Sequence, residues 1–336
     1  MSGCEDAAIM ARRETGRLNG IGFGTWAWGN QLVWGYQPER DDPRLEETFR
    51  EAIRSGLRLV DTADSYGTGR LTGRSETLLG HFVQALPATL QGELLVATKL
   101  APFPWRLGRR GLDRAFAASR DRLQGNLQRV QLHWSTARYA PWQEVSLLDG
   151  LADLVLSGAV RELGVSNTGP RRLEWMQDRL EQRGVRLSSV QVQFSLLAPG
   201  DRRLQDLLEV CRRRRIEMLA YSPLAFGVLC QPPDAQPRPG TVLRRRLFNR
   251  LLPASFPIRE ELKRVADLRG VSMVQVALNW CRSHGTTPIP GLRSPDQARQ
   301  AAAALNWDLT AEERHRLDML RSDCLTRMPA NPFESA

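Results

Sequence analysis

The stretch LRLVDTADSYGTGR, residues 57–70, determines how the rest of this sequence is interpreted. It begins with a short apolar run, which is typical of a buried strand, and continues into residues that favour a turn. A carboxylate at Asp61 and a phenol at Tyr66 follow the run directly. The stretch therefore predicts a strand over 57–63 that carries polar side chains at its carboxyl end.

Seven more apolar runs alternate with segments whose apolar residues recur at helical spacing. They predict strands over 20–26, 93–100, 129–134, 161–167, 189–197, 216–224 and 286–292. Several of the helical segments begin after Ser, Asp or Pro and end at Gly, as helix boundaries do. Eight strands separated by helices favour an α/β fold of the (β/α)₈ TIM barrel type over an open doubly wound sheet.

One interval between strands is longer than the others. After the seventh strand the Pro-rich stretch QPPDAQPRPG, residues 231–240, leads into an inserted helix that precedes the eighth strand. Long βα loops usually shape a binding site. Because no change of composition marks a linker, we expect a single domain over residues 1–336, with an N-terminal extension and a core of about 18–322.

The composition excludes several classes of protein. The chain has 336 residues, of which 42% are hydrophobic and 25% charged, as in globular proteins. We expect no membrane span, because no run approaches the ~18 apolar residues that a span needs. The first twenty residues lack the apolar region of a secretory signal, so we expect a cytoplasmic protein, with import into the chloroplast as the alternative.

Charge and cysteine usage also argue against some partners. The formal net charge is +10, but acidic residues are interspersed with the arginines, so we predict no nucleic-acid partner. The five cysteines show no metal-ligand spacing, and we predict no metal site. The oligomeric state is left open by the sequence. The cysteines are Cys4, Cys211, Cys230, Cys281 and Cys324.

Lysine is rare in this chain, and one lysine ends an apolar run. Among the 47 basic residues, Lys99 and Lys263 are the lysines. A buried positive charge at the end of ELLVATKL, residues 93–100, is costly unless it is paired. His133 ends the next strand. Together with Asp61 and Tyr66, these residues place titratable groups at the carboxyl ends of three consecutive strands, which share one mouth in a barrel.

These four groups can perform one half of a carbonyl reduction. A nearby ammonium at Lys99 would lower the pKa of the Tyr66 phenol, and Asp61 would hold the lysine. His133 could direct a carbonyl oxygen by a hydrogen bond. Each residue taken alone also has a structural interpretation, as a turn, a packed aromatic ring or a core histidine. Since no side chain delivers a hydride, the chemistry requires a nicotinamide cofactor.

The sequence resembles the aldo-keto reductase family, closest to its plant and algal plastid-associated branch. The resemblance rests on GTWAWGNQLVWGY, DTADSYG, VATKL, PWRL, QLHWS, GVSN, QVQFSLL, AYSPL and PIPG. It implies an NADP(H)-dependent oxidoreductase that acts on a small carbonyl substrate. It also implies that Asp61, Tyr66, Lys99 and His133 are catalytic, with Tyr66 as the proton donor.

The resemblance further implies a set of cofactor-binding residues. Ser166, Asn167 and Gln193 would bind the nicotinamide carboxamide, and Tyr221 would stack on its ring. The remaining residues would follow the pyrophosphate and the adenosine 2′-phosphate, with Arg293 as the charge partner of that phosphate: Ser222, Pro223, Leu224, Gly227, Gly291, Arg293, Ser294 and Gln297. The departure from the family at Gln300 and Ala301 weakens the expected preference for NADP over NAD.

Trp26 and Trp134, at strand ends, are candidates for the substrate pocket. Two other functions are compatible with the same residues. The chain could be a catalytically weak NADP-binding scaffold or regulatory subunit of the same fold. It could also be an unrelated barrel enzyme that forms a Schiff base at Lys99, although Asp61 would keep that amine protonated.

Overall fold

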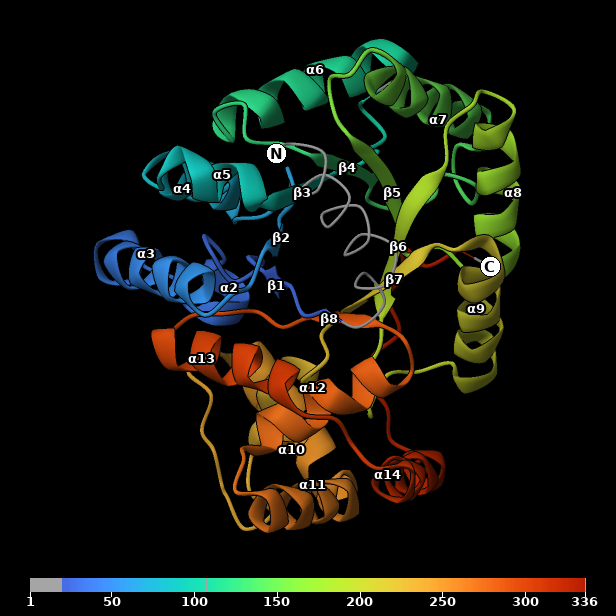
Figure 1. Ribbon diagram of the computed structural model, residues 1–336. Coiled ribbons are helices and arrows are strands. Elements are labelled where there is room, and N and C mark those ends of the chain that lie inside the picture. The colour runs from blue at the N-terminus through green and yellow to red at the C-terminus, as the bar shows by residue number, and fades with distance from the viewer. Residues whose placement is uncertain (1–19, 107, 336) are drawn as a thin grey trace, which may run out of the picture.

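The computed structural model describes residues 20–106 and 108–335. Eight parallel strands lie at its centre in sequential order, and helices surround them (Figure 1). The predicted N-terminal extension and Cys4 lie outside the described residues. The strands are β1 (Phe23–Gly24), β2 (Leu59–Asp61), β3 (Leu95–Leu100), β4 (Arg129–Leu132), β5 (Glu162–Ser166), β6 (Leu187–Gln193), β7 (Glu217–Tyr221) and β8 (Thr287–Ile289).

The sheet closes between its first and last strands. The backbone N–H of Gly22 donates to the carbonyl of Pro288 at 3.1 Å, and that of Gly24 donates to Pro290 at 2.9 Å. Closure removes the sheet edges. The predicted (β/α)₈ barrel is thus confirmed, with all eight strands within or close to their expected ranges.

Most strands end earlier than the sequence predicts. The strand expected over 189–197 ends at Gln193, and the one expected over 216–224 ends at Tyr221. In both cases the residues that follow turn out of the sheet, and Ser222 has a positive φ of 50°. The apolar residues beyond the end of β6, such as Phe194, Leu196 and Leu197, pack into the hydrophobic core instead of extending the strand.

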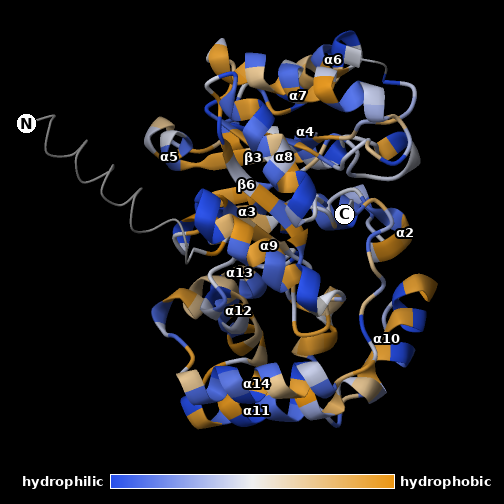
Figure 2. Ribbon diagram, turned by 90° about the vertical axis from the view of Figure 1, so that its right-hand side faces the viewer, coloured by the Kyte–Doolittle hydropathy of each residue, from blue (hydrophilic) through white to orange (hydrophobic). Residues whose placement is uncertain are grey.

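Helices cover the outside of the barrel. Hydrophobic and hydrophilic residues alternate along most of these helices, whereas β3 is mostly hydrophobic (Figure 2). The helices are α2 (Gln31–Trp34), α3 (Pro38–Arg54), α4 (Arg74–Gln84), α5 (Ala88–Glu93), α6 (Gly108–Arg122), α7 (Pro141–Leu156), α8 (Pro170–Glu181), α9 (Asp201–Arg214), α12 (Met273–Ser283), α13 (Pro295–Ala303) and α14 (Ala311–Asp323).

The insertion between β7 and β8 contains more helix than expected. A short turn, η2 (Ala225–Cys230), follows β7, and two helices rather than one come next, α10 (Val242–Ala254) and α11 (Phe256–Arg269). The break at Ser255 has a local cause, since Pro257 stands in the first turn of α11, where proline is tolerated. In Figure 1 these helices lie below the barrel, beside α12.

Helix α4 packs closely on the end of α6 through a glycine. A Cβ built on Gly80 would lie 2.3 Å from the carbonyl oxygen of Arg122 and 2.9 Å from Cα of Leu123. We predict that Gly80→Ala lowers the free energy of unfolding by about 1–3 kcal/mol, because this backbone must move apart to admit the methyl group. Urea denaturation measures the change.

The matched control is Gly92→Ala in α5, where a Cβ would meet no atom within 4 Å. There the higher helix propensity of alanine should leave stability unchanged or raise it by up to ~1 kcal/mol. Equal effects of the two substitutions would contradict the close packing at Gly80.

Candidate active site

A buried ion pair lies at the carboxyl ends of β2 and β3. Nζ of Lys99 is 2.5 Å from Oδ2 of Asp61, and the two side chains are 1% and 2% exposed. Nζ also donates to the carbonyl of Thr62 at 2.7 Å. Burial lowers the pKa of Lys99, but Asp61 and Tyr66 outweigh it, and the net pKa is raised. Lys99 is therefore a charged ammonium.

Two glutamines hold the other oxygen of Asp61. Nε2 of Gln131 in β4 donates to Oδ1 at 3.0 Å, and Nε2 of Gln191 in β6 donates at 2.9 Å. The sequence analysis did not identify either residue. The signal was present, because both are polar residues inside apolar strand segments, RVQL and SVQVQ. They satisfy a carboxylate that would otherwise be buried with one partner.

The Tyr66 ring lies beside the ion pair. Its centroid is 4.9 Å from Nζ of Lys99, and the ring packs edge-on against His133 at 5.9 Å. The loop is held in place by the N–H of Gly73, which donates to the carbonyl of Tyr66 at 2.8 Å. The expected fall of the Tyr66 pKa is not found. Burial raises this pKa by more than Lys99 lowers it, so the phenol stays protonated at neutral pH.

His133 follows β4 and faces the same mouth. Burial, with the charges of Lys99 and Arg106, lowers its pKa well below 6.5. The imidazole is therefore neutral at pH 7. Its Nδ1 lies 3.3 Å from Oγ of Ser65, in the loop that carries Tyr66.

A second buried carboxylate lies next to these residues. Asp64 accepts hydrogen bonds from the N–H of Ala101 at 3.2 and 3.3 Å and pairs with Arg106. Burial raises the pKa of Asp64 to about 6, against the effect of Arg106. This pair was also missed by the sequence analysis. It connects the β2 loop to the segment after β3 and so helps to position Tyr66.

Most of the residues expected around the nicotinamide lie together. Oγ of Ser166 donates to the carbonyl of Gln191 at 3.1 Å, and Nδ2 of Asn167 lies 3.2 Å from that Oγ. The hydroxyl of Tyr221 donates to Oδ1 of Asn167 at 2.9 Å. Gln193 pairs with Tyr221 in the neighbouring strand. All of these stand at the carboxyl ends of β5, β6 and β7.

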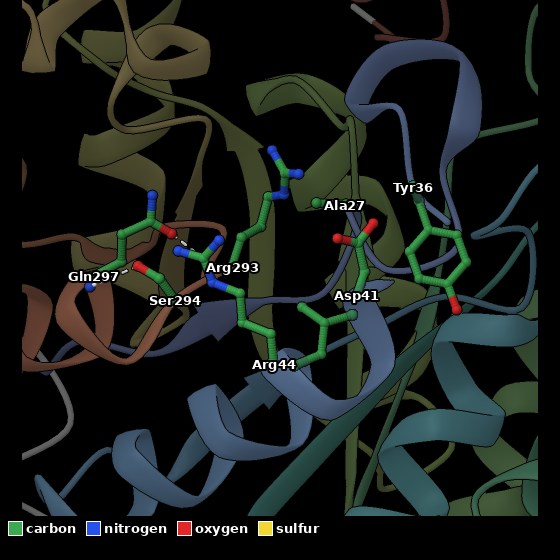
Figure 3. A pocket seen from close by; sticks show the side chains of 8 residues that line it. Ala27, Tyr36, Asp41, Arg44, Arg293, Ser294 and Gln297 are labelled. Carbon is green, nitrogen blue, oxygen red and sulfur yellow. Dashed lines mark hydrogen bonds between the residues drawn. The ribbon is translucent and has the colours of Figure 1, made fainter. Parts of the chain in front are cut away.

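A polar cavity of about 150 Å³ lies between α3 and the start of α13. Figure 3 shows Arg293, Ser294 and Gln297 on one side of it and Arg44 from α3 near them. Oε1 of Gln297 accepts from the N–H of Arg293 at 2.8 Å, and Ser294 is the N-cap of α13. Gly291 precedes this group and pairs with Gly24.

The cavity carries unbalanced positive charge. Within the described residues neither Arg44 nor Arg293 forms an ion pair, and burial lowers the pKa of Arg293. Asp41 also lines the cavity, but Arg40 pairs with it at 2.8 Å. Two arginines and a helix N-terminus around one cavity form a site for an anion. The sequence analysis identified Arg293 and missed Arg44, which lies about 250 residues away in the chain.

The turn after β7 has an unusual backbone. Beyond Ser222, positive φ values occur at Ala225, Phe226 and Gly227, while Pro223 and Leu224 lie between. Arg244 of α10 donates to the carbonyl of Phe226 at 3.1 Å and lies 4.4 Å from the Trp34 ring. The insertion therefore supplies a third arginine near this region.

The two tryptophans proposed for the substrate pocket have different surroundings. The Trp134 ring lies 5.1 Å from the ring of His133. Trp26 packs edge-on against Trp34 at 6.1 Å and Phe226 at 5.4 Å. Trp134 thus adjoins the four titratable groups, whereas Trp26 lies among the rings near the insertion.

In residues 20–106 and 108–335, no three His, Cys, Asp or Glu side chains are grouped so that they could hold a metal ion. No helix in this part of the chain is long and apolar enough to cross a membrane.

The buried ion pair gives a prediction on stability. Lys99→Met leaves the Asp61 carboxylate buried without its countercharge, and we expect the free energy of unfolding to fall by about 3–5 kcal/mol. Lys99→Met combined with Asp61→Asn removes both charges while an amide oxygen remains for the two glutamines, so part of the loss should be recovered. Urea denaturation of the three proteins tests this. A double variant less stable than the single one would contradict it.

Comparisons with known proteins agree with this geometry. The sequence signature described as "Aldo/keto reductase family" matches residues 20–322. A chloroplastic pyridoxal reductase of Arabidopsis thaliana is 46% identical over 319 residues, which cover 94% of this chain and 86% of the relative. An aldo-keto reductase of Klebsiella pneumoniae, solved in complex with NADPH, is 27% identical with a TM-score of 0.67, covering 94% of each chain.

A glycerol dehydrogenase of Gluconobacter oxydans has the same fold, with a TM-score of 0.73 at 23% identity over 94% of this chain and 95% of that one. The family signature covers the whole barrel, from before β1 to within α14, and therefore includes every residue of the mouth described above. The chain belongs to the aldo/keto reductase family.

Proposed function

We propose that this protein is an NADPH-dependent reductase of an aromatic aldehyde, with Tyr66 as the proton donor. The observation that carries the proposal is the position of Lys99, whose ammonium is fixed by Asp61 and adjoins the Tyr66 ring. When bound, the nicotinamide cofactor supplies the hydride. The protein must then supply a proton to the developing alkoxide and hold the carbonyl in place.

Tyr66 is suited to give up a proton at the moment it is needed. Its raised pKa keeps the phenol protonated before the reaction. As the proton leaves, the phenolate forms beside the Lys99 ammonium, which stabilises it electrostatically. Asp61 keeps that ammonium charged and oriented. A Schiff base at Lys99 is disfavoured for the same reason, because an amine with a raised pKa is a poor nucleophile.

His133 would orient the substrate. In our proposal the hydroxyl of Ser65 donates to Nδ1, so the neutral ring carries its proton on Nε2. From there it donates a hydrogen bond to the carbonyl oxygen of the substrate. Because the ring is neutral, it does not compete with Tyr66 as the acid.

The cavity between α3 and α13 fits the 2′-phosphate of NADP(H). Arg293, Ser294, Gln297 and Arg44 provide two cations and hydrogen-bond donors around about 150 Å³. Asp41 is the carboxylate that lines this cavity, and it acts on Arg293 electrostatically while it pairs with Arg40, so positive charge remains in excess and supports a bound anion. The turn with Ser222 and Gly227, near Arg244, would follow the pyrophosphate.

Two observations support an aromatic aldehyde as the substrate. Trp134 lies beside His133, and the Phe103 ring packs edge-on against the Trp134 ring at 5.6 Å. The mouth therefore has an aromatic wall. The Arabidopsis relative is named a pyridoxal reductase. We propose pyridoxal, an aromatic aldehyde, as the first substrate to test. The name of the same relative favours the chloroplast over the cytoplasm as the location of this protein.

The proton donor can be tested by removing one oxygen atom. We predict that Tyr66→Phe lowers kcat for pyridoxal about 10²–10⁴-fold, the range typical of a lost general acid, and leaves NADPH affinity unchanged. Steady-state NADPH oxidation and fluorescence titration measure the two quantities. Tyr139→Phe removes a hydroxyl at the same mouth, 2.8 Å from Nε1 of Trp134, and serves as the control.

Near-normal turnover in the Tyr66→Phe variant would exclude Tyr66 as the acid. If the parent protein binds NADPH and reduces no aldehyde or ketone in a broad panel, the scaffold alternative replaces the reductase.

The phosphate site can be tested by comparing two cofactors. We predict that Arg293→Ala and Arg44→Ala each weaken NADPH binding about 10- to 100-fold, since a charge-assisted contact contributes about 1.5–3 kcal/mol. NADH, which lacks the 2′-phosphate, should bind with little change. The control is Arg50→Ala, an exposed arginine of α3 that pairs with Glu46. Equal losses for NADPH and NADH would place the 2′-phosphate elsewhere.

A further inference from the structure

The segment after α14 crosses the mouth of the barrel. We call residues 328–335 the latch. It begins at Met328, whose N–H donates to the carbonyl of Leu197 at 2.8 Å, and it reaches Ser335, whose N–H donates to the carbonyl of Asn167 at 3.0 Å. Glu334 lies 3.4 Å from Arg203 of α9. The latch therefore lies over the ends of β5, β6 and β7.

Asn331 is the centre of this contact. Its Nδ2 donates to Oδ1 of Asn167 at 2.9 Å and to the hydroxyl of Tyr221 at 2.9 Å. Its own Oδ1 accepts from the N–H of Phe333 at 3.0 Å, which fixes the side chain in this orientation.

The side chain of Asn167 has no hydrogen-bonding capacity left. Its Oδ1 accepts from Tyr221 and from Asn331, and its Nδ2 donates to the carbonyl of His133 at 3.0 Å and to Oγ of Ser166 at 3.2 Å. A primary amide offers two acceptor sites and two donor hydrogens, and all four are used. In this arrangement Oδ1 of Asn167 cannot also accept from a nicotinamide carboxamide.

The group on Asn331 is chemically the same as the group it would exclude. The side chain of asparagine and the 3-substituent of nicotinamide are both primary carboxamides. The –NH₂ of Asn331 makes with Oδ1 of Asn167 a hydrogen bond of the kind that a nicotinamide –NH₂ could make.

We propose that the latch is an intramolecular competitor of the cofactor, in which the Asn331 carboxamide occupies the place of the nicotinamide carboxamide on Asn167 and Tyr221. This inference rests on the proposed function, because it places the nicotinamide of NADP(H) where the family resemblance implies, with its carboxamide at Asn167 and its ring beside Tyr221. Cofactor binding then requires the latch to leave, and the measured affinity is reduced by the fraction of molecules in which the latch is open.

The latch also covers the substrate side of the mouth. The Phe333 ring stacks on Trp134 with centroids 4.4 Å apart and an angle of 21° between the planes. Phe333 is only two residues from Asn331, so when the cofactor displaces Asn331 the stack of Phe333 on Trp134 is weakened. The face of the Trp134 ring that Phe333 covers then becomes free for an aldehyde.

The test compares two ligands on the full chain. Asn331→Leu removes the donor and keeps the size of the side chain, and Phe333→Ala weakens the latch at a separate contact. We expect both variants to bind NADPH about tenfold more tightly than the parent protein. Both should bind 2′-phospho-ADP-ribose, which lacks the nicotinamide, with parental affinity. Asn306→Leu, at an exposed asparagine, is the control and should change neither value.

The possible outcomes separate this inference from the proposed function. If the parent protein binds neither ligand, the assignment of the NADP(H) site fails. If both ligands bind and Asn331→Leu leaves NADPH affinity unchanged or weakens it, the latch does not compete and the inference is overturned. A gain that appears equally with 2′-phospho-ADP-ribose would also overturn it, because the effect would then not concern the carboxamide.

Discussion

The ion pair between Asp61 and Lys99 is the interaction on which the rest of the mouth depends. Two opposite charges buried among strands are stable only if their remaining hydrogen-bonding groups are satisfied. Here Gln131, Gln191 and the carbonyl of Thr62 satisfy them. Asp61 and Lys99 belong to β2 and β3, and the two glutamines come from β4 and β6, so the pair ties together strands that are not all neighbours and fixes their relative heights at the barrel end.

The ion pair also explains why this chain, which otherwise uses arginine, has a lysine at position 99. Arginine carries almost all of its positive charge, and where a planar fork suits an anion, as at Arg44 and Arg293, arginine is the residue present. The buried position at the end of β3 is different. The cation at this position must contact Asp61, the Thr62 carbonyl and the Tyr66 ring at the same time. A compact ammonium can do so, whereas a larger planar guanidinium cannot. At Lys99, in contrast to the exposed Lys263, the choice of lysine therefore reflects a specific steric requirement.

The mouth is a connected polar network and not a set of independent residues. Asn167 joins His133 to Tyr221, and Asp64 with Arg106 joins the Tyr66 loop to the segment after β3. Burial, which raises the pKa of Tyr66 and lowers that of His133, keeps both groups neutral. In such a network a change at one residue alters the partners available to the others, which is how a segment far along the chain can affect the side chains of Asn167 and Tyr221.

The sequence alone determined the eight strands, the barrel and the residues at the strand ends, because the period of apolar residues and the position of a strand end are local properties. Local pattern marks Gln131 and Gln191 as polar residues inside apolar strands, but it could not assign them a role, since their contact with Asp61 exists only where the strands meet around that carboxylate. It could not find Arg44, which reaches the cavity of Arg293 through the closure of the barrel. It also gave the wrong direction for the pKa of Tyr66. The effect of a charge on its neighbour can be inferred from adjacency, whereas the opposing effect of burial depends on how completely the folded chain excludes water from the ring.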